Sequence, residues 1–250
     1  MKTMVTRIFS LLVLLFLSSS VVSAKRTYVQ KIDSIVSVSR FRVSVDGGLA
    51  YLIASTKNAK SQMSGYGISD LESDRYYREF KLGEQYGASV HYMINPRYGL
   101  GVDYSLFTTG SSVMGFVDSQ DVVNRYYGIF SEQVYTNYIG LSYLQVRNLS
   151  SKWSYYGKLS VGISLYRNES MMIIAPILIT GNSPAIMGFS GINYSFSKHV
   201  SAGICISDFF SVLTKIRVDD GTNINEVKLE GELKENLSRF SLTTGIQIHF

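Results

Sequence analysis

The chain has 250 residues and a formal net charge of +5, from 24 basic and 19 acidic side chains. This charge is small and spread along the chain, so it does not indicate a nucleic-acid partner. A single cysteine, Cys205, excludes an internal disulfide, and its position predicts a small buried thiol. The 18 Tyr and 21 Gly against only 3 Pro, with abundant Val and Ile, favour strands over helices.

The N-terminus has the pattern of an export signal. Lys2 and Arg7 accompany the short apolar run 8–17, and Val22-Ser23-Ala24 forms a small-residue cleavage site. This order predicts a signal peptide over residues 1–24 that is cleaved after Ala24. The apolar run is shorter than the roughly 20 residues of a spanning helix, and the well-formed cleavage site disfavours the alternative of an uncleaved anchor.

Beyond residue 24 the chain repeats short segments in which apolar and polar residues alternate. Residues 25–40 show no clear phase and are interpreted as a periplasmic lead-in. Strands are then predicted at about Phe41–Ile53, Glu84–Ile94, Tyr98–Thr108, Ser131–Val146, Trp153–Tyr166, Ala185–Phe196, Val200–Leu213 and Leu237–Phe250. The connections alternate between long and short. We expect the long ones, 54–82, 109–130, 167–184 and 214–236, to be loops.

The last strand shows the pattern most clearly. Its apolar register contains Phe240, Leu242, Ile246, Ile248 and Phe250, and the intervening positions carry no apolar residue. Side chains in a strand alternate faces, so this strand has one apolar and one polar face.

Together these features predict an all-β protein, an eight-stranded antiparallel up-and-down transmembrane β-barrel over residues 41–250. Such barrels have an even number of strands, short periplasmic turns, longer extracellular loops and aromatic residues at the interfaces. Aromatic residues beside the predicted short turns would form the periplasmic girdle: Trp153, Tyr155, Tyr194 and Phe196, with Tyr92, Tyr98, Tyr143 and the terminal Phe250.

The chain resembles the small eight-stranded outer-membrane β-barrel family, of which outer membrane protein X and the transmembrane domain of outer membrane protein A are typical. The resemblance covers the signal peptide, the strand pattern, the loop alternation and the terminal Phe250. It implies location in the outer membrane of a Gram-negative-type cell, in contact with outer-membrane lipid. It also implies that the apolar register of the last strand is an assembly signal read by the barrel-assembly machinery.

Charged residues fall in the inward register, where they would line a pore or form ion pairs that fill the lumen. They are Arg42, Asp46, Glu84, His91, Asp103, Lys158 and Arg239. Unpaired buried charge is costly, both signs occur in similar number, and a barrel of eight strands leaves little room for water. The ion-pair interpretation is therefore favoured.

No catalytic, cofactor or metal site is predicted. A lipid-modifying enzyme would need a histidine at the extracellular rim, whereas His91, His199 and His249 fall near predicted periplasmic ends. The acidic stretch Asp219-Asp220-Gly221 lacks the spacing of a helix-loop-helix calcium site and is interpreted as a solvated turn. The apolar stretch Met171–Ile179 is either a strand extension, a fold over the barrel mouth, or an exposed patch that contacts a partner or lipid.

Two functions remain open. The first is a non-enzymatic, porin-like outer-membrane protein with a structural or interaction role carried by its extracellular loops and an unknown loop-binding partner. The alternative is a soluble periplasmic eight-stranded barrel that binds a small apolar ligand inside, with its apolar residues facing inward.

Overall fold

The computed structural model describes the chain except for residues 1–38, 55–59, 61–62, 119–124 and 174. The predicted signal peptide with Ala24 therefore lies outside the described residues, as does the lead-in apart from Ser39 and Arg40. Among the helices that are described, none has the length and apolar character needed to cross a membrane.

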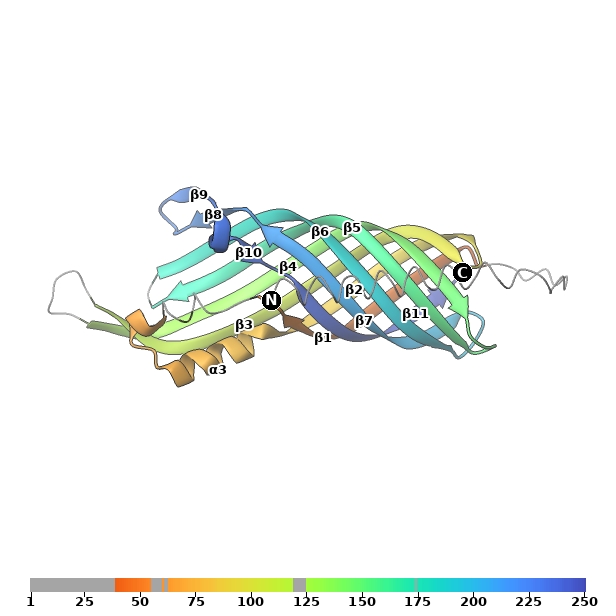
Figure 1. The fold of residues 1–250 in the computed structure, drawn as a ribbon, viewed down its shortest axis with the longest axis horizontal. Helices are drawn as coiled ribbons and strands as arrows, with labels where there is room; N and C mark the ends of the chain where they lie inside the picture. Colours follow the sequence, from red (N-terminus) through yellow and green to blue (C-terminus); the bar gives the residue numbers. More distant parts are fainter. Residues whose placement is uncertain (1–38, 55–59, 61–62, 119–124, 174) are drawn as a thin grey trace. The chain divides into compact units, whose positions relative to one another are not determined.

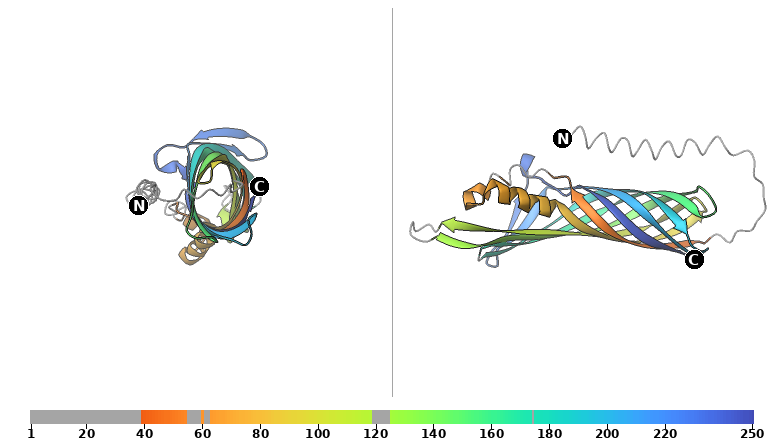
Figure 2. Two further views of the ribbon diagram at one scale, coloured as in Figure 1. Left: turned by 90° about the vertical axis from the view of Figure 1, so that its right-hand side faces the viewer. Right: turned by 90° about the horizontal axis from the view of Figure 1, so that it is seen from below.

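Eight strands form a closed antiparallel ring in the described part of the chain (Figures 1 and 2). They are β1 (Phe41–Leu52), β2 (Leu82–Asn95), β3 (Tyr98–Asp118), β4 (Arg125–Asn148), β5 (Trp153–Met172), β6 (Ala175–Ser195), β7 (Val200–Leu213) and β11 (Arg239–His249). Each strand pairs with its sequence neighbour around the ring, and β11 pairs with both β7 and β1. The predicted fold class is confirmed.

The apolar register of the strands faces outward. Large apolar side chains on this face remain exposed: Val45, Leu49, Val90, Leu100, Val102, Ile139, Leu141, Val161, Ile163, Ile204, Ile206, Leu242 and Ile246. Buried positions along the same strands carry small polar residues such as Ser89, Ser105 and Ser160. A continuous apolar exterior of this kind is typical of a surface that meets lipid rather than water.

The three short turns are stabilised by polar side chains that accept backbone hydrogen bonds. Asn95 Oδ1 accepts from the amides of Arg97 and Tyr98, both at 2.9 Å. The Ser150 and Ser197 hydroxyls accept from the amides two and three residues further on in their turns. Asn and Ser commonly form such hydrogen bonds in turns, so these turns can be predicted from the sequence. At the same end, the Phe250 amide donates to the Phe41 carbonyl at 2.9 Å and extends the ring closure to the last residue.

The strands on the opposite side are longer than predicted. β3 and β4 continue to Asp118 and from Arg125, and β5 and β6 continue to Met172 and from Ala175. The prediction that 109–130 and 167–184 are loops was therefore wrong, because most of these residues belong to paired strands. Within the apolar stretch Met171–Ile179, residues 171–172 end β5 and residues 175–179 begin β6, in agreement with the strand-extension alternative. Pro176 and Pro184 lie inside β6, although proline is rare in strand interiors.

The first long connection contains a helix, α3 (Asp70–Lys81), preceded by the short η1 (Ser64–Tyr66). The prediction of a structureless loop over 54–82 was wrong here. The Ser69 hydroxyl accepts from the Glu72 amide and the Glu72 carboxylate accepts from the Ser69 amide, a complete capping box. The motif Ser69-x-x-Glu72 could have identified this helix start in the sequence.

The last long connection also contains ordered structure. β8 (Lys215–Asp219) pairs with β6 and with β9 (Ile224–Lys228), which returns as a hairpin. The short η2 (Gly231–Leu233) and β10 (Glu235–Asn236) follow, and β10 pairs with β7. Residues 214–236 are therefore not a simple loop. The hairpin lies beside the ring in the view along the barrel (Figure 2, left).

Candidate functional site

A buried ion pair lies in the half of the lumen near the short turns. Lys158 Nζ on β5 lies 2.7 Å from Asp103 Oδ1 on β3. Both side chains are almost fully buried, at 8% and 2% exposure. The ammonium group also lies 3.8 Å from the centre of the Phe189 ring. This short, desolvated pair joins β3 and β5, which are separated in the ring by β4 alone.

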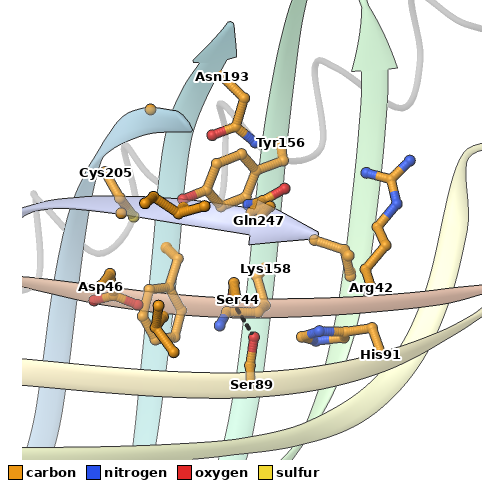
Figure 3. A pocket seen from close by; sticks show the side chains of 16 residues that line it. Arg42, Ser44, Asp46, Ser89, His91, Tyr156, Lys158, Asn193, Cys205 and Gln247 are labelled. Atoms are coloured by element: carbon orange, nitrogen blue, oxygen red, sulfur yellow. Dashed lines mark hydrogen bonds between the residues drawn. The ribbon is translucent and has the colours of Figure 1, made fainter. Parts of the chain in front are cut away.

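A small cavity lies beside this pair. Its volume is about 30 Å³, which is room for about one water molecule. The polar side chains that line it enter from different strands (Figure 3): Arg42, Ser44, Asp46, Ser89, His91, Tyr156, Lys158, Asn193, Cys205 and Gln247. Cys205 is buried here, as predicted.

Inward-facing glycines make room for the lumen charges. A Cβ at Gly87 would lie 2.7 Å from Asp46 Oδ1, and a Cβ at Gly101 would lie 2.6 Å from His91 Cδ2. These contacts are shorter than real Cβ atoms show. At Gly101 a Cβ would also lie 2.2 Å from the Val90 carbonyl oxygen, so a larger residue there would have to displace backbone as well as His91.

The lumen contains Ser, His and Asp side chains together, but not in a catalytic arrangement. His91 Nε2 lies 2.8 Å from Ser142 Oγ and 3.9 Å from Asp103 Oδ1. In a catalytic triad the carboxylate holds the opposite ring nitrogen from the one that faces the nucleophile. Here the Ser142 hydroxyl and the Asp103 carboxylate both face Nε2 of His91. Ser142 and His91 are also buried, at 4% and 3% exposure.

The other two histidines lie at the end with the short turns. His199 Nδ1 is 3.0 Å from the His249 carbonyl oxygen, and His249 Nε2 is 3.0 Å from Ser201 Oγ. Among the described residues, no group of three or more His, Cys, Asp or Glu side chains is arranged to hold a metal ion.

Arg239 lies in the lumen further along the barrel. Its guanidinium carbon lies 3.8 Å from the Phe209 ring centre and 4.7 Å from that of Phe107. Nε donates to Gln85 Oε1 at 3.1 Å, while the two terminal nitrogens have no hydrogen-bond partner among the described residues. Arg239 is completely buried. The predicted lumen charge is thus stacked between two aromatic rings rather than ion-paired.

Apolar packing continues from this stack toward the long connections. Phe209 and Tyr138 belong to a buried cluster with Val134, Tyr166, Ala185, Met187, Leu213 and Leu237. Phe80 of α3 packs against it, and Thr109 Oγ1 donates to the Phe80 carbonyl at 2.7 Å. Buried apolar side chains thus pack toward the long connections, and a smaller apolar cluster of Met93, Leu144 and Val146 lies near the short turns, beyond the polar side chains around Lys158.

Above this cluster, α3 packs against the extended strands. Tyr76 and Tyr77 of α3 join Met63, Ile68 and Phe130 in a second buried cluster. The Glu132 carboxylate accepts hydrogen bonds there from Asn168 and Tyr76. Burial raises the pKa of the Glu132 carboxyl above its usual range, and these two hydrogen bonds oppose the shift. α3 is thus held by packing and by a partly desolvated polar contact.

The predicted girdle residues meet at the end with the short turns. Trp153 and Tyr194 pack edge to face at 5.0 Å, and Tyr194 packs against Phe196 at 5.2 Å. Lys152 Nζ lies 5.8 Å from the Tyr194 ring centre. The Tyr155 hydroxyl lies 3.1 Å from Ser190 Oγ.

The apolar register of the terminal strand points away from the lumen. Phe240 is half-buried, whereas Leu242, Ile246, Ile248 and Phe250 are exposed on the outer surface. The structure thus places the predicted assembly-signal residues on one outer face.

The structure places the predicted inward charge Glu84 and the predicted acidic turn at Asp219 and Asp220 as follows. Glu84 was counted as an inward charge, but it is exposed on the outer face and accepts from the Tyr86 hydroxyl at 2.6 Å. That assignment was wrong, because Glu84 shares the register of Tyr86. Asp219 and Asp220 accept backbone amides within the β8–β9 turn, an arrangement typical of a solvated acidic turn.

An open groove lies on the outer face of the strand extensions, beside the β8–β9 turn. Its volume is about 590 Å³. It is lined by Ser131, Gln133, Arg167, Glu169, Met171, Pro176, Leu178, Asp219 and Gly221, among others. The apolar stretch noted in the sequence thus contributes Met171, Pro176 and Leu178 to a groove of mixed polarity, which we call the outer groove.

These features define the class of the molecule: an eight-stranded antiparallel barrel with an apolar exterior and charged and polar side chains buried in its lumen. No protein-family model and no curated protein sequence matches the chain.

Several solved structures are similar in fold. Neisserial surface protein A has 15% sequence identity and a TM-score of 0.46, over 84% of this chain and 97% of that one. A major outer membrane protein from Thermus thermophilus has 12% identity and a TM-score of 0.49, over 84% and 99%. The outer membrane protein OprG from Pseudomonas aeruginosa has 12% identity and a TM-score of 0.42, over 85% and 98%.

Proposed function

We propose that this protein is a non-enzymatic integral outer-membrane barrel whose lumen is closed and whose extracellular elements mediate contacts. The observation that carries the proposal is the direction of the apolar register. Exposed Val, Ile and Leu side chains form the outside of the ring, while the buried interior is polar and charged near the short turns. In water this surface would be a severe aggregation liability, whereas in a bilayer it is the favourable arrangement.

The same observation argues against the soluble ligand-binding alternative. A lipocalin-like barrel needs an apolar cavity inside to receive an apolar ligand. The cavity found in the lumen is about 30 Å³ and is lined mainly by charged and polar groups. Small-molecule sites typically occupy about 300–1,000 Å³.

A closed lumen is supported by two layers of packing. The Lys158–Asp103 pair fills one level, and the Arg239 guanidinium stacked on Phe209 fills the next. The absence of catalysis is supported by the His91 geometry, in which serine and carboxylate share one nitrogen. A contact role is supported by the outer groove and by exposed side chains beyond the apolar band, such as Tyr127 at 69% and Met114 at 61% exposure.

The location is tested by cell fractionation with gel mobility before and after heating, and by labelling from outside the cell. Single cysteines at Gly65 and Asn223, in a Cys205→Ser background, should react on intact cells with a membrane-impermeant thiol reagent. A cysteine at Arg97, in a short turn, should react only after lysis. Labelling at position 97 alone would reverse the orientation, and a soluble protein without heat-modifiable mobility would refute the proposal.

The contact role is tested separately by replacing large side chains of the extracellular elements with serine. Cells that carry Met114→Ser with Tyr127→Ser, or Met171→Ser with Leu178→Ser, are compared with wild type for aggregation and surface attachment. Loss of either behaviour at equal membrane levels would support a contact role. Unchanged behaviour in both variants would remove the reason to assign one to these surfaces.

A further inference from the structure

The strands β3 and β4 continue past their neighbours as a two-stranded ribbon. Among the described residues, β2 pairs with β3 only as far as Thr108, and β5 pairs with β4 only from Phe130 onward. The pairing of β3 with β4 continues beyond these points to Asp118 and Arg125. Figure 1 shows the ribbon at the end of the barrel opposite the C-terminus. We call residues 113–116 together with residues 126–129 the ribbon tip.

The ribbon tip exposes apolar and aromatic side chains on both of its faces. Met114, Tyr127 and Ile129 share the outward register and are 61%, 69% and 50% exposed. Tyr126 points to the opposite face, because neighbours in a strand alternate, and it is 50% exposed. A flat protein surface that docks on a ribbon covers one face of it. A lipid interface surrounds both faces, so the exposure on two sides favours lipid.

Polar residues separate the ribbon tip from the apolar exterior of the barrel. Gly110 pairs with Gln133 in the outward register, and two residues further along Ser112 pairs with Ser131. The tip is therefore a second apolar surface and does not continue the first. None of the outward positions of the tip, nor of these two pairs, carries a charged residue. This face of the tip thus offers no ion pair to a charged partner.

The base of the ribbon is supported by the segment that precedes and includes α3. Tyr66 and Ile68 pack with Phe130 in the second buried cluster, to which α3 also contributes. At the tip itself, the ring of Phe116 lies 5.8 Å from that of Tyr127. The exposed side chains are thus presented on a supported ribbon, so less conformational freedom is lost when they bind.

The exposed area of the tip is small for a protein interface. Its four exposed side chains offer roughly 400 Å² together, since one large side chain contributes about 150–250 Å² when it is fully covered. A stable protein interface buries about 800 Å² per partner. Tyrosine is also enriched at membrane–water interfaces, where the ring meets lipid and the hydroxyl remains hydrated. Size and residue type both favour a lipid surface as the partner.

We propose that the ribbon tip inserts into the surface of a second lipid bilayer, one that lies against the cell surface and needs no net charge. Met114 and Ile129 enter the apolar layer of that bilayer, and Tyr126 and Tyr127 lie at its interface with water. The inference names the partner of the contact role given under the proposed function, and it rests on that function and its orientation.

The test measures binding of the barrel to vesicles. The full-length processed protein is placed in lipid nanodiscs and mixed with phosphatidylcholine vesicles, and the fraction of protein that floats with the vesicles is measured. The tip variants are Met114→Ser with Tyr127→Ser, and Tyr126→Ser alone. Leu71→Ser with Ile224→Ser is the matched control, because Leu71 on α3 and Ile224 on β9 are also exposed, at 78% and 53%, in the long connections.

Wild type and the control variant should bind the vesicles at least tenfold more than empty nanodiscs do. Met114→Ser with Tyr127→Ser should lose this binding, and Tyr126→Ser should weaken it severalfold. Equal flotation of wild type and both tip variants would overturn the inference, and so would binding that requires phosphatidylglycerol in the vesicles.

Two further outcomes separate this inference from others. Association of wild-type nanodiscs with one another without vesicles, lost in the tip variants, would overturn the choice of lipid in favour of a second copy of the chain. Protein that enters nanodiscs but binds no vesicles would contradict this inference alone. Failure of the protein to enter any nanodisc would instead contradict the proposed function, on which the inference rests.

Discussion

Removing Lys158 should destabilise the barrel strongly. Lys158→Met keeps the length of the side chain but leaves the Asp103 carboxylate in the lumen at 2% exposure. The nearest remaining basic group is His91, whose Nε2 lies 3.9 Å from Asp103 Oδ1. Breaking a buried pair by deleting one partner costs about 3–5 kcal/mol. With an m-value of about 2 kcal/mol/M, the urea midpoint should fall by roughly 2 M.

The pair itself, rather than either charge, is responsible for this loss. Replacing both residues, as in Lys158→Met with Asp103→Leu, removes the stranded charge, and apolar replacement of a buried pair is often close to neutral. The double variant should therefore recover most of the stability lost by either single variant. A double-mutant cycle then measures the coupling between the two side chains.

The assay is equilibrium urea unfolding of the refolded barrel in lipid vesicles. Trp153 is the single tryptophan and packs against Tyr194 at the end with the short turns, so its fluorescence reports the barrel without added labels. The reasoning is refuted if Lys158→Met costs less than about 1 kcal/mol, the range of a solvent-screened pair. It is equally refuted if the double variant is as unstable as the sum of the single variants.

Three further predictions follow from other parts of the barrel. Deleting Phe250 should lower the amount of protein inserted in cells far more than it lowers the stability of refolded protein, because burial of one large aromatic side chain contributes only about 1.5–3 kcal/mol. The control His249→Ala should change neither quantity. Normal insertion without Phe250 together with a severe loss in His249→Ala would contradict the register of β11. Reconstituted wild-type protein should show no stable conductance in planar bilayers, and steady porin-like openings would disprove the Arg239 closure. Because burial raises the pKa of Glu132, the native state binds its proton more tightly than the unfolded chain, so this group's contribution to stability falls as pH rises from the ordinary value of 4.5 through the raised one. Glu132→Gln should therefore raise the urea midpoint at pH 7 relative to wild type but not at pH 3, and an equal effect at both pH values would contradict this assignment.

Much of the barrel could be predicted because apolar and polar residues alternate along each strand, so every second residue shows which face is apolar. A one-residue error would turn Leu242, Ile246 and Ile248 inward, so the alternation determines the register strongly. The short turns carry their own signals, such as Asn95-Pro96 and Ser197. The predicted inward charges Asp103, Lys158 and Arg239 also lie in the lumen.

The partners of these charges could not be predicted. Alternation specifies the face of a residue but not its depth, so Asp103 and Lys158 could not be paired from the sequence alone. Arg239 was expected to form an ion pair, yet its surroundings are Phe107, Phe209 and Gln85. Which inward side chains meet depends on the strand stagger, which is a property of the closed ring.

The elements at the end opposite the short turns were missed for a different reason. Their residues alternate less sharply, since packed side chains such as Tyr76 and Tyr77 of α3 cover part of the extended strands there. β6 contains Pro176 and Pro184, a residue type that is rare in the interior of a strand. α3 was not predicted because the overall composition favoured strands over helices, although the Ser69-x-x-Glu72 capping motif was present in the sequence.

The central claim is that the apolar exterior faces lipid. The most direct measurement is depth-resolved fluorescence quenching of single labels at Val102, Leu141 and Val161, which are 45%, 74% and 57% exposed on the outer face. In vesicles, brominated lipids should quench these three labels strongly, while aqueous acrylamide should not. A label at Asn223 in the β8–β9 turn should behave in the opposite way. Quenching of all four labels by acrylamide and of none by brominated lipid would contradict a membrane-spanning barrel.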